Sequence, residues 1–141
     1  MTAFIISCGD ASRRRLSRYF DGQCQKISEV RLLDIVEAID RIYQKVSGIS
    51  LDAFQGDLDR RWIVERGVEI ISEASRRLPD DLKARHPEIP WKKVAGIGNI
   101  VRHDYENVSA SALWKLAHDD LPTLEKACRD ELAEIRQRDP P

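Results

Sequence analysis

Residues 30–46, VRLLDIVEAIDRIYQKV, carry the clearest pattern in this chain and decide its fold class. Apolar side chains recur there at intervals of one helical turn, namely Leu32, Ile35, Val36, Ile39, Ile42, Tyr43 and Val46. This spacing places them on one face of an α-helix. The pattern therefore predicts an amphipathic helix over about residues 30–47, with a glycine of the following SGIS segment at its C-terminal end.

The same spacing continues beyond this segment. A side-chain cap at Asp52 or Asp57 begins a second helix, which reaches about Leu78 because Pro79 cannot continue it. The polar stretch DDLKARHPEI, residues 80–89, is then expected to form a loop. The apolar face of the second helix would consist of Ile63, Val64, Gly67, Val68, Ile71, Ala74 and Leu78.

A third helix is expected to begin near Trp91, because Pro90 suits a first helical position. The segment NVSAS ends it and supplies a Ser cap for ALWKLAHDD, residues 112–120. A last helix begins at Asp119 or Asp120 with Pro122 and reaches about Arg136. Four or five helices with short connections, no strand candidate and no internal repeat predict an all-α, up-and-down bundle.

The 141 residues suit one domain with one core, and 42% hydrophobic with 33% charged residues is typical of a soluble globular protein. Residues 1–29 differ from the rest because they show no sustained period. We therefore expect an atypical N-terminal extension over residues 1–29, followed by the helical domain over residues 30–138.

Neither export nor membrane insertion is indicated. The apolar run AFIISC is too short for a secretory signal, its arginines follow it, and no run approaches the ~20 residues that span a bilayer. Cys8, Cys24 and Cys128 are far apart and lack the CxxC spacing of a zinc site or a disulfide framework. We expect a cytoplasmic protein without a metal or other cofactor.

The charge of the chain is nearly balanced but unevenly distributed. The net charge is −1, yet residues 60–102 hold ten Lys or Arg against six Asp or Glu, and residues 103–141 hold five against nine. A basic middle segment could attract a phosphate backbone. A solvated surface of mixed charge explains the same composition equally well.

Residues 96–108, GIGNIVRHDYENV, are unusual for a helix that only packs. Gly96 and Gly98 each cost roughly 1 kcal/mol relative to Ala, so a close approach by another helix or a ligand should offset them. Asn99 and His103 are four residues apart and therefore neighbours on the helix surface, with Arg102 beside them.

This cluster has the chemistry that RNA cleavage needs. An imidazole serves as general acid or base near neutral pH, and a guanidinium clamps a phosphate with two hydrogen bonds. RNA supplies its own nucleophile, the 2′-hydroxyl, so a His and an Arg without a metal suffice in principle. From spacing alone, however, a lone His-Arg pair is more often structural than catalytic.

Four segments resemble, in order, the HepT-like branch of the HEPN proteins. They are RLLDIVEAIDRIYQKV, VERGVEIISEASRRLP, HPEIPWKKVAGIGNIVRHDYENV and LWKLAHDDLPTLEKA. The resemblance covers about residues 31–136, and PEIPWKKVAGIGNIVRHDY is its most specific part. It implies an all-helical HEPN bundle that forms a homodimer with a shared cleft, and it implies metal-independent RNA cleavage.

The resemblance also implies a setting and a partner. The setting is a bacterial or archaeal toxin–antitoxin pair, and the partner is a minimal nucleotidyltransferase (MNT) antitoxin. In this family the antitoxin silences the toxin by transferring AMP to the Tyr of an Arg-x4-His-x-Tyr motif. His103 then matches the catalytic His, Tyr105 the modified Tyr, and Asn99 the polar residue after the Arg. Glu73 becomes a possible polar neighbour of the site, although an ordinary exposed charge explains it as well.

The chain departs from this motif at one position. The Arg should lie five residues before His103, where this chain has Gly98. Arg102 lies one turn after Gly98, and helical side chains lean toward the N-terminus, so its guanidinium could reach the space that Gly98 leaves. Arg102 is therefore the predicted phosphate clamp. The alternative is a catalytically inactive HEPN module that binds nucleotide or its partner.

Overall fold

The computed structural model describes residues 2–103 and 108–140, with side chains described from Arg13 onward. Every element in these ranges is helical, which confirms the predicted all-α fold. The elements are α1 (Thr2–Val46), α2 (Leu51–Gly56), α3 (Leu58–Arg76), α4 (Asp80–Ala84), α5 (Trp91–His103), α6 (Ala110–Lys115), the π-helical turn η1 (Leu116–Asp120) and α7 (Leu121–Arg138).

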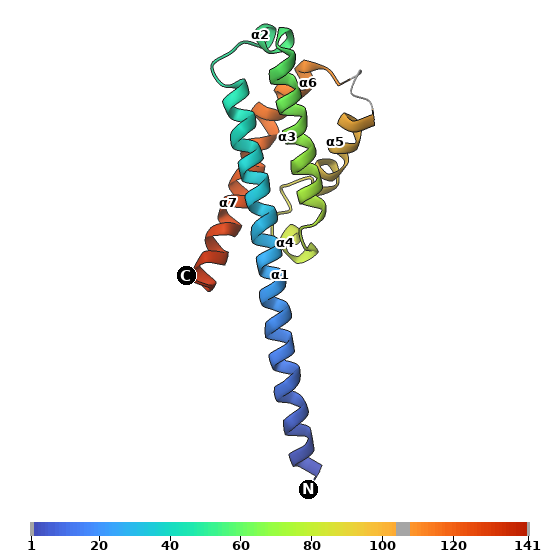
Figure 1. Cartoon of the computed structure of the whole chain (residues 1–141), viewed down its shortest axis with the longest axis vertical. Helices are drawn as coiled ribbons and strands as arrows, with labels where there is room; N and C mark the ends of the chain where they lie inside the picture. The colour runs from blue at the N-terminus through green and yellow to red at the C-terminus, as the bar shows by residue number, and fades with distance from the viewer. Residues whose placement is uncertain (1, 104–107, 141) are drawn as a thin grey trace.

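The core lies between α1, α3 and α7, with α5 packed on the side of α3 (Figure 1). Leu32, Ile35, Ile39 and Ile42 of α1 are fully buried, which confirms the face predicted for this helix. A Cβ on Gly67 would lie 2.8 Å from Ile42, so α3 crosses α1 closely at this glycine. Hydrophobic burial on these faces stabilises the bundle.

Helix α1 is much longer than predicted. It begins at Thr2 instead of near residue 30, and its first part projects away from the bundle (Figure 1). Among the side chains that are described, Ser28 is the first buried one, and continuous packing begins at Leu32. Residues 13–27 therefore form a helical arm whose side chains, apart from half-buried Gln25, are exposed in the single chain.

The caps explain where most helices begin. The Asp57 carboxylate accepts a hydrogen bond from the Arg60 N–H at 3.1 Å and caps α3, as predicted. Ser109 caps α6 in the same way through the Ala112 N–H, which confirms the predicted Ser cap. Gly48 ends α1 with a φ of +74°, a conformation that favours glycine.

Two connections differ from the prediction. Helix α4 lies in the expected loop, held by buried Leu82 and by the Trp91 indole, which donates to the Lys83 carbonyl at 3.0 Å. No side-chain cap at Asp120 begins α7, because η1 joins α6 to α7 without a break. This wide turn adds a residue and keeps both Ala117 and Leu121 on the buried face.

The three tryptophans differ in burial. Trp62 is 61% exposed, whereas Trp91 and Trp114 pack against the core. Within the described part of the chain, none of the helices combines the length and the apolar character needed to span a bilayer.

Candidate active site

Gly98 lies where α5 touches α3. Its Cα is buried, and a Cβ there would lie 2.5 Å from the hydroxyl oxygen of Ser72 and 2.6 Å from its Cβ. The Ser72 hydroxyl accepts a hydrogen bond from the Gly98 N–H at 3.2 Å and donates to the Ala95 carbonyl at 2.7 Å. The expected close helix approach is confirmed at Gly98. It is not found at Gly96, where a Cβ would have nothing within 4 Å.

This contact explains the departure from the family motif. An arginine at position 98 would place its Cβ inside Ser72, so α3 and α5 approach each other more closely than such a side chain allows. It also corrects one expectation. The space beside Gly98 is filled by Ser72, so it is not available to the guanidinium of Arg102.

Arg102 instead borders a polar groove between α1, α3 and α5. The side chain is exposed and makes no ion pair with any described residue. Glu73, the predicted supporting residue, lines the same groove and pairs with Arg77 at 3.1 Å. The residues that line this groove are Arg31, Asp34, Arg66, Glu69, Ile70, Glu73, Ala74 and Arg102.

His103 ends α5 on its outer face. The imidazole is exposed, and Asn99, one turn earlier, is exposed on the same side. Ile100 lies beside His103 on the helix surface and is 57% exposed, which is unusual for a large aliphatic side chain. The structure thus brings Asn99 and His103 together, with Arg102 turned about 100° away toward the groove. Tyr105 lies outside the described residues.

A charge cluster fixes the segment that leads into α5. Buried Glu131 of α7, 5% exposed, accepts two hydrogen bonds from Arg85 at 3.0 and 2.8 Å, and His86 Nε2 lies 2.7 Å away. The Arg85 guanidinium holds the pKa of Glu131 below its ordinary value. His86, in the segment expected to form a loop, lies between the carboxylates of Glu131 and Glu88.

Sequence reasoning missed Ser72 and the Glu131 cluster. A signal existed for Ser72, because it continues the buried face of Val64 and Val68 with a small polar side chain. Such a residue on an apolar face indicates a close helix contact. Glu131 gave no comparable signal, because a Glu near the end of a charged helix is ordinarily solvated.

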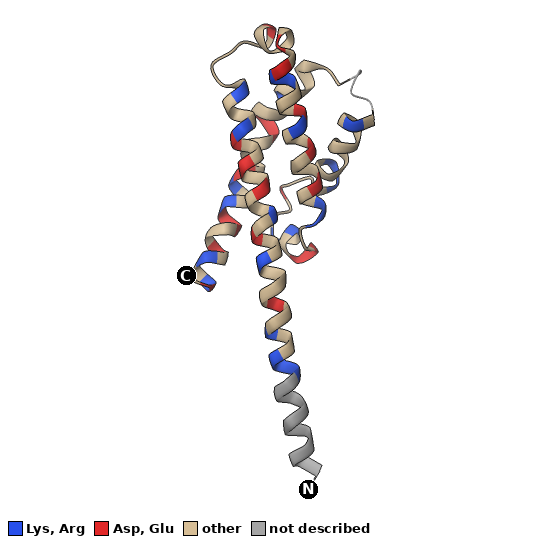
Figure 2. Ribbon diagram, viewed as in Figure 1, with Lys and Arg blue, Asp and Glu red and all other residues tan. Residues whose placement is uncertain are grey.

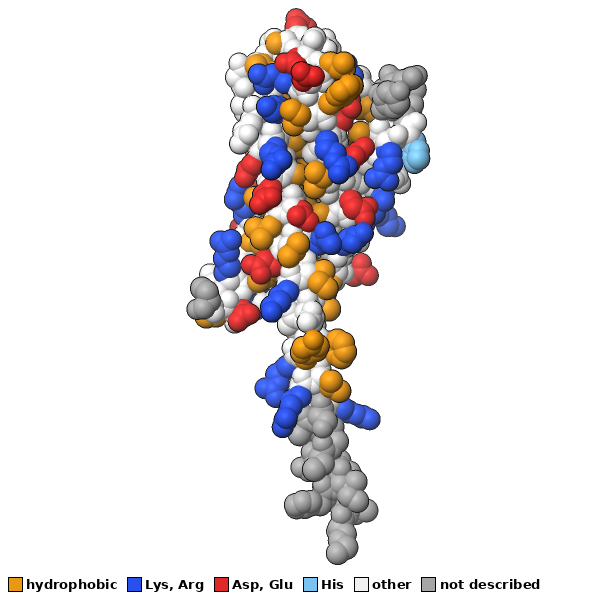
Figure 3. All heavy atoms as spheres, viewed as in Figure 1, with side chains coloured by type: hydrophobic (Ala, Val, Ile, Leu, Met, Phe, Trp, Pro, Cys, Tyr) orange, Lys and Arg blue, Asp and Glu red, His pale blue; other side chains and the backbone are white. Residues whose placement is uncertain are grey.

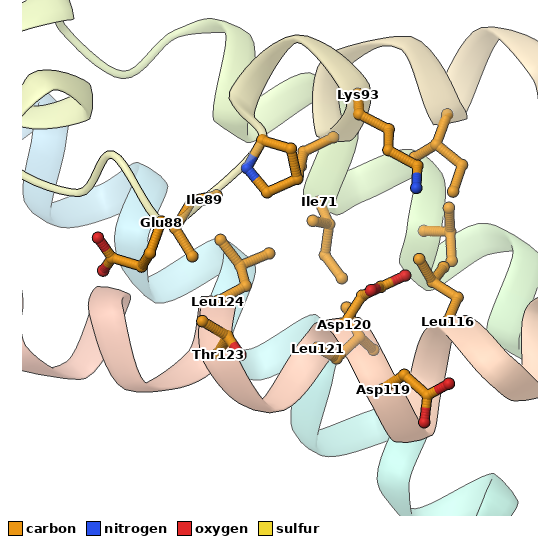
Figure 4. Close-up of a pocket in the computed structure, with 14 residues that line it drawn as sticks. Ile71, Glu88, Ile89, Lys93, Leu116, Asp119, Asp120, Leu121, Thr123 and Leu124 are labelled. Atoms are coloured by element: carbon orange, nitrogen blue, oxygen red, sulfur yellow. The ribbon is translucent and has the colours of Figure 1, made fainter.

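An apolar cavity of ≈ 130 Å³ lies behind α5, away from His103 and Arg102. Figure 4 shows Ile71, Ile89 and Leu124 in its lining, with Lys93 on the α5 side and Asp119 and Asp120 on the opposite side. The predicted site residues that the structure describes do not line it. The candidate site is therefore a surface of α5 and the adjoining groove, and not this cavity.

The family model for HepT-like ribonucleases matches residues 35–131. This chain belongs to the HepT-like ribonuclease family. RNA cleavage is accordingly its class of activity and RNA its class of substrate. His103, Arg102 and Asn99 lie within the matched region, and the arm formed by residues 13–27 lies ahead of it.

Individual relatives agree with the family model. A protein of Thermococcus cleftensis named "Probable ribonuclease HepT" is 40% identical over 93 residues, which cover 66% of this chain and 84% of the relative. A protein of Methanocaldococcus jannaschii named "Putative RNase" is 34% identical over 95 residues, 67% of this chain and 87% of the relative. No solved structure matches the chain significantly.

Proposed function

We propose that this HepT-like protein is the toxin of a HEPN/MNT toxin–antitoxin pair, a metal-independent endoribonuclease that acts in the cytoplasm. One observation carries the proposal: His103 and Arg102 are both exposed at the end of α5, and no described residue pairs with Arg102. The Arg102 cation at the edge of the groove and the exposed His103 imidazole next to it in the chain are available to a phosphate substrate.

The residues have separate roles in the proposed reaction. The His103 imidazole takes the proton of the RNA 2′-hydroxyl, whose oxygen then bonds to the adjacent phosphorus. The bond from phosphorus to the 5′-oxygen breaks, and that oxygen receives a proton. Arg102 neutralises the charge that develops on the phosphate, and Asn99 orients the imidazole or the phosphate. Glu73 is a supporting polar neighbour of Arg102 in the same groove.

Homodimer formation fits the outer face of α5. Ile100 is exposed beside His103, and Gly96 on the same face has open space where a Cβ would stand. A second copy covering this apolar surface would place its own His103 and Arg102 across a shared cleft. One copy then supplies the base and the other the acid.

Control by an antitoxin is the second part of the proposal. The MNT partner transfers AMP from ATP to the Tyr105 hydroxyl, with pyrophosphate as the leaving group. Because the AMP would sit two residues beyond His103, its phosphate would repel RNA and its base would block the cleft. A Tyr105→Phe variant should escape this silencing while it still cleaves RNA.

The alternative is a HEPN module that binds nucleotide or partner without cleaving. It is favoured by the burial of Gly98 against Ser72, which leaves no residue at the position of the motif arginine. The RNA recovered after incubation with the protein distinguishes the ribonuclease from the binding module. Cleavage by the proposed route leaves a 2′,3′-cyclic phosphate and a 5′-hydroxyl end, whereas a binding module leaves the RNA intact and only retards it.

A further inference from the structure

The helical arm of residues 13–27 exposes a stripe of large apolar side chains. Leu16, Tyr19, Phe20 and Ile27 of the arm, and Val30 just after it, are between 52% and 63% exposed. Hydrophobic side chains gather along the arm where it leaves the bundle (Figure 3). Isolated exposed apolar residues are normal, but a row of them on an unpacked helix indicates an interaction surface.

The spacing of the stripe is that of a coiled coil. Leu16, Phe20, Gln23, Ile27 and Val30 follow one another at intervals of four, three, four and three residues. At 100° per residue they fall within an arc of about 80°, turned about a third of a revolution from the buried face of α1. The stripe is therefore a second seam on α1, separate from the face that packs in the bundle.

Charges leave the seam open to another helix. Arg15, Arg18 and Glu29 lie on other faces of α1, so a helix packed on the seam would leave them in water. Basic residues of the arm and mixed charges of the bundle are visible in Figure 2. Gln23 is the one polar residue in the seam, and a single buried amide facing its own copy sets the register of a parallel pair.

The surface that continues the seam favours a second copy over RNA. Going up α1, the seam arc leads to Asp34 and Arg31, which line the groove that Arg102 borders. This groove holds three arginines and three carboxylates, including the pairs Arg31–Asp34 at 3.2 Å and Arg66–Glu69 at 3.0 Å. These paired charges on α1 and α3 suit a two-fold contact with a second copy and leave no surplus positive charge there for a phosphate backbone, whereas Arg102 stays open at the α5 edge of the groove.

We propose that the arm pairs in parallel and in register with the arm of a second copy, as a short coiled coil. This inference rests on the proposed homodimer, because a seam of about two heptads is too short to associate strongly alone. Once the bundles are joined, the arms are held at high effective concentration and the seam closes. The arm thereby stabilises the dimer that forms the shared cleft.

Disulfide trapping of the full chain tests the pairing. In a Cys8→Ser, Cys24→Ser background, Leu16→Cys, Gln23→Cys and Val30→Cys are each oxidised and run on a non-reducing gel. All three should form covalent dimers, because in-register pairing sets each cysteine against its own copy. Gly22→Cys, next to Gln23 but on another face of the helix, is the matched control and should stay monomeric on the gel.

Each other result overturns the pairing. If Gln23→Cys is trapped but Leu16→Cys is not, the arms run antiparallel. A third result would be that no seam cysteine is trapped and that the double variant Phe20→Glu, Ile27→Glu binds RNA more weakly. The stripe would then be an RNA-binding surface. Ile100→Cys, on the outer face of α5, reports the dimer of the bundles separately. If Ile100→Cys is trapped and Gln23→Cys is not, the pairing of the arms is refuted and the proposed homodimer stands.

Discussion

The Gly98 N–H donates to the Ser72 hydroxyl at 3.2 Å, and that hydroxyl fills the space that a side chain at position 98 would need. The motif helix therefore carries no arginine at the expected place because α3 occupies it. In the proposed reaction, the phosphate-binding cation therefore comes from another position. Arg102, exposed at the edge of the groove, is the residue we assign to it.

Substitution of Gly98 tests the close contact. Gly98→Ala should lower the free energy of unfolding by ~1–3 kcal/mol, because the added Cβ overlaps Ser72. Gly96→Ala, two residues away, meets nothing and should raise it by up to ~1 kcal/mol through helix propensity. Urea denaturation measures both. Equal effects of the two substitutions would mean that α3 and α5 are not in tight contact at Gly98.

Arg102 is expected to act on cleavage and not on stability. Arg102→Ala should slow RNA cleavage about a hundredfold or more, because it removes the charge that stabilises the phosphate in the transition state. Arg66→Ala is the matched control, since Arg66 borders the same groove but pairs with Glu69 at 3.0 Å. Initial rates and melting curves separate the two properties. Undiminished cleavage by Arg102→Ala would refute the assignment.

Glu131 should make stability depend on acid pH. Its pKa is lowered in the folded chain, chiefly by the Arg85 hydrogen bonds, so its contribution is present above the ordinary value of 4.5 and is lost as the pH falls through the folded pKa. Glu131→Gln should destabilise the protein by ~1.5–3 kcal/mol at pH 7 and progressively less as the pH falls below that range.

The comparison needs a carboxylate of the same helix that is not buried. Glu134 pairs with Arg138 at 3.2 Å at the surface, so Glu134→Gln should change the stability by less than ~0.5 kcal/mol at any pH. Chemical denaturation across the acid range distinguishes the two variants. A difference between Glu131→Gln and the parent that does not shrink with acid would contradict the ionic role of Glu131.

The two cysteines whose side chains are described should differ in reactivity. Cys128 is 1% exposed and burial raises its pKa to about 12, so in the folded chain it should resist thiol reagents at pH 8. Cys24 is exposed on the arm and should react readily. Labelling in a Cys8→Ser background, followed by mass spectrometry of peptides, assigns each site. Rapid labelling of Cys128 before unfolding would show that the α7 core opens.

The sequence predicted the bundle because its signals are local. Apolar spacing over residues 30–46 identified the buried face of α1. Asp57 was one of two predicted caps, and Ser109 is the cap that the NVSAS segment was expected to supply. Such features depend on neighbours within a turn or two, which one sequence displays fully. The class of protein followed from the HepT-like segments, and the family match confirms it.

The remainder depended on partners distant in sequence. Gly98 is explained by Ser72, which lies 26 residues earlier, and His86 by Glu131, which lies 45 residues later. Apolar spacing shows which face of a helix is buried but not which side chain it meets. The helical arm was missed for a related reason. Its seam packs on nothing within the described chain, and its apolar spacing is weaker and less regular than that of residues 30–46.

The most direct test of the account is RNA cleavage by the purified protein in excess EDTA, beside His103→Ala. The account predicts cleavage by the parent protein and none by the variant, with the two proteins equally stable because His103 is exposed. Intact RNA with both proteins, across a broad set of sequences, would contradict it. That outcome would assign the end of α5 to binding, or to AMP acceptance at Tyr105.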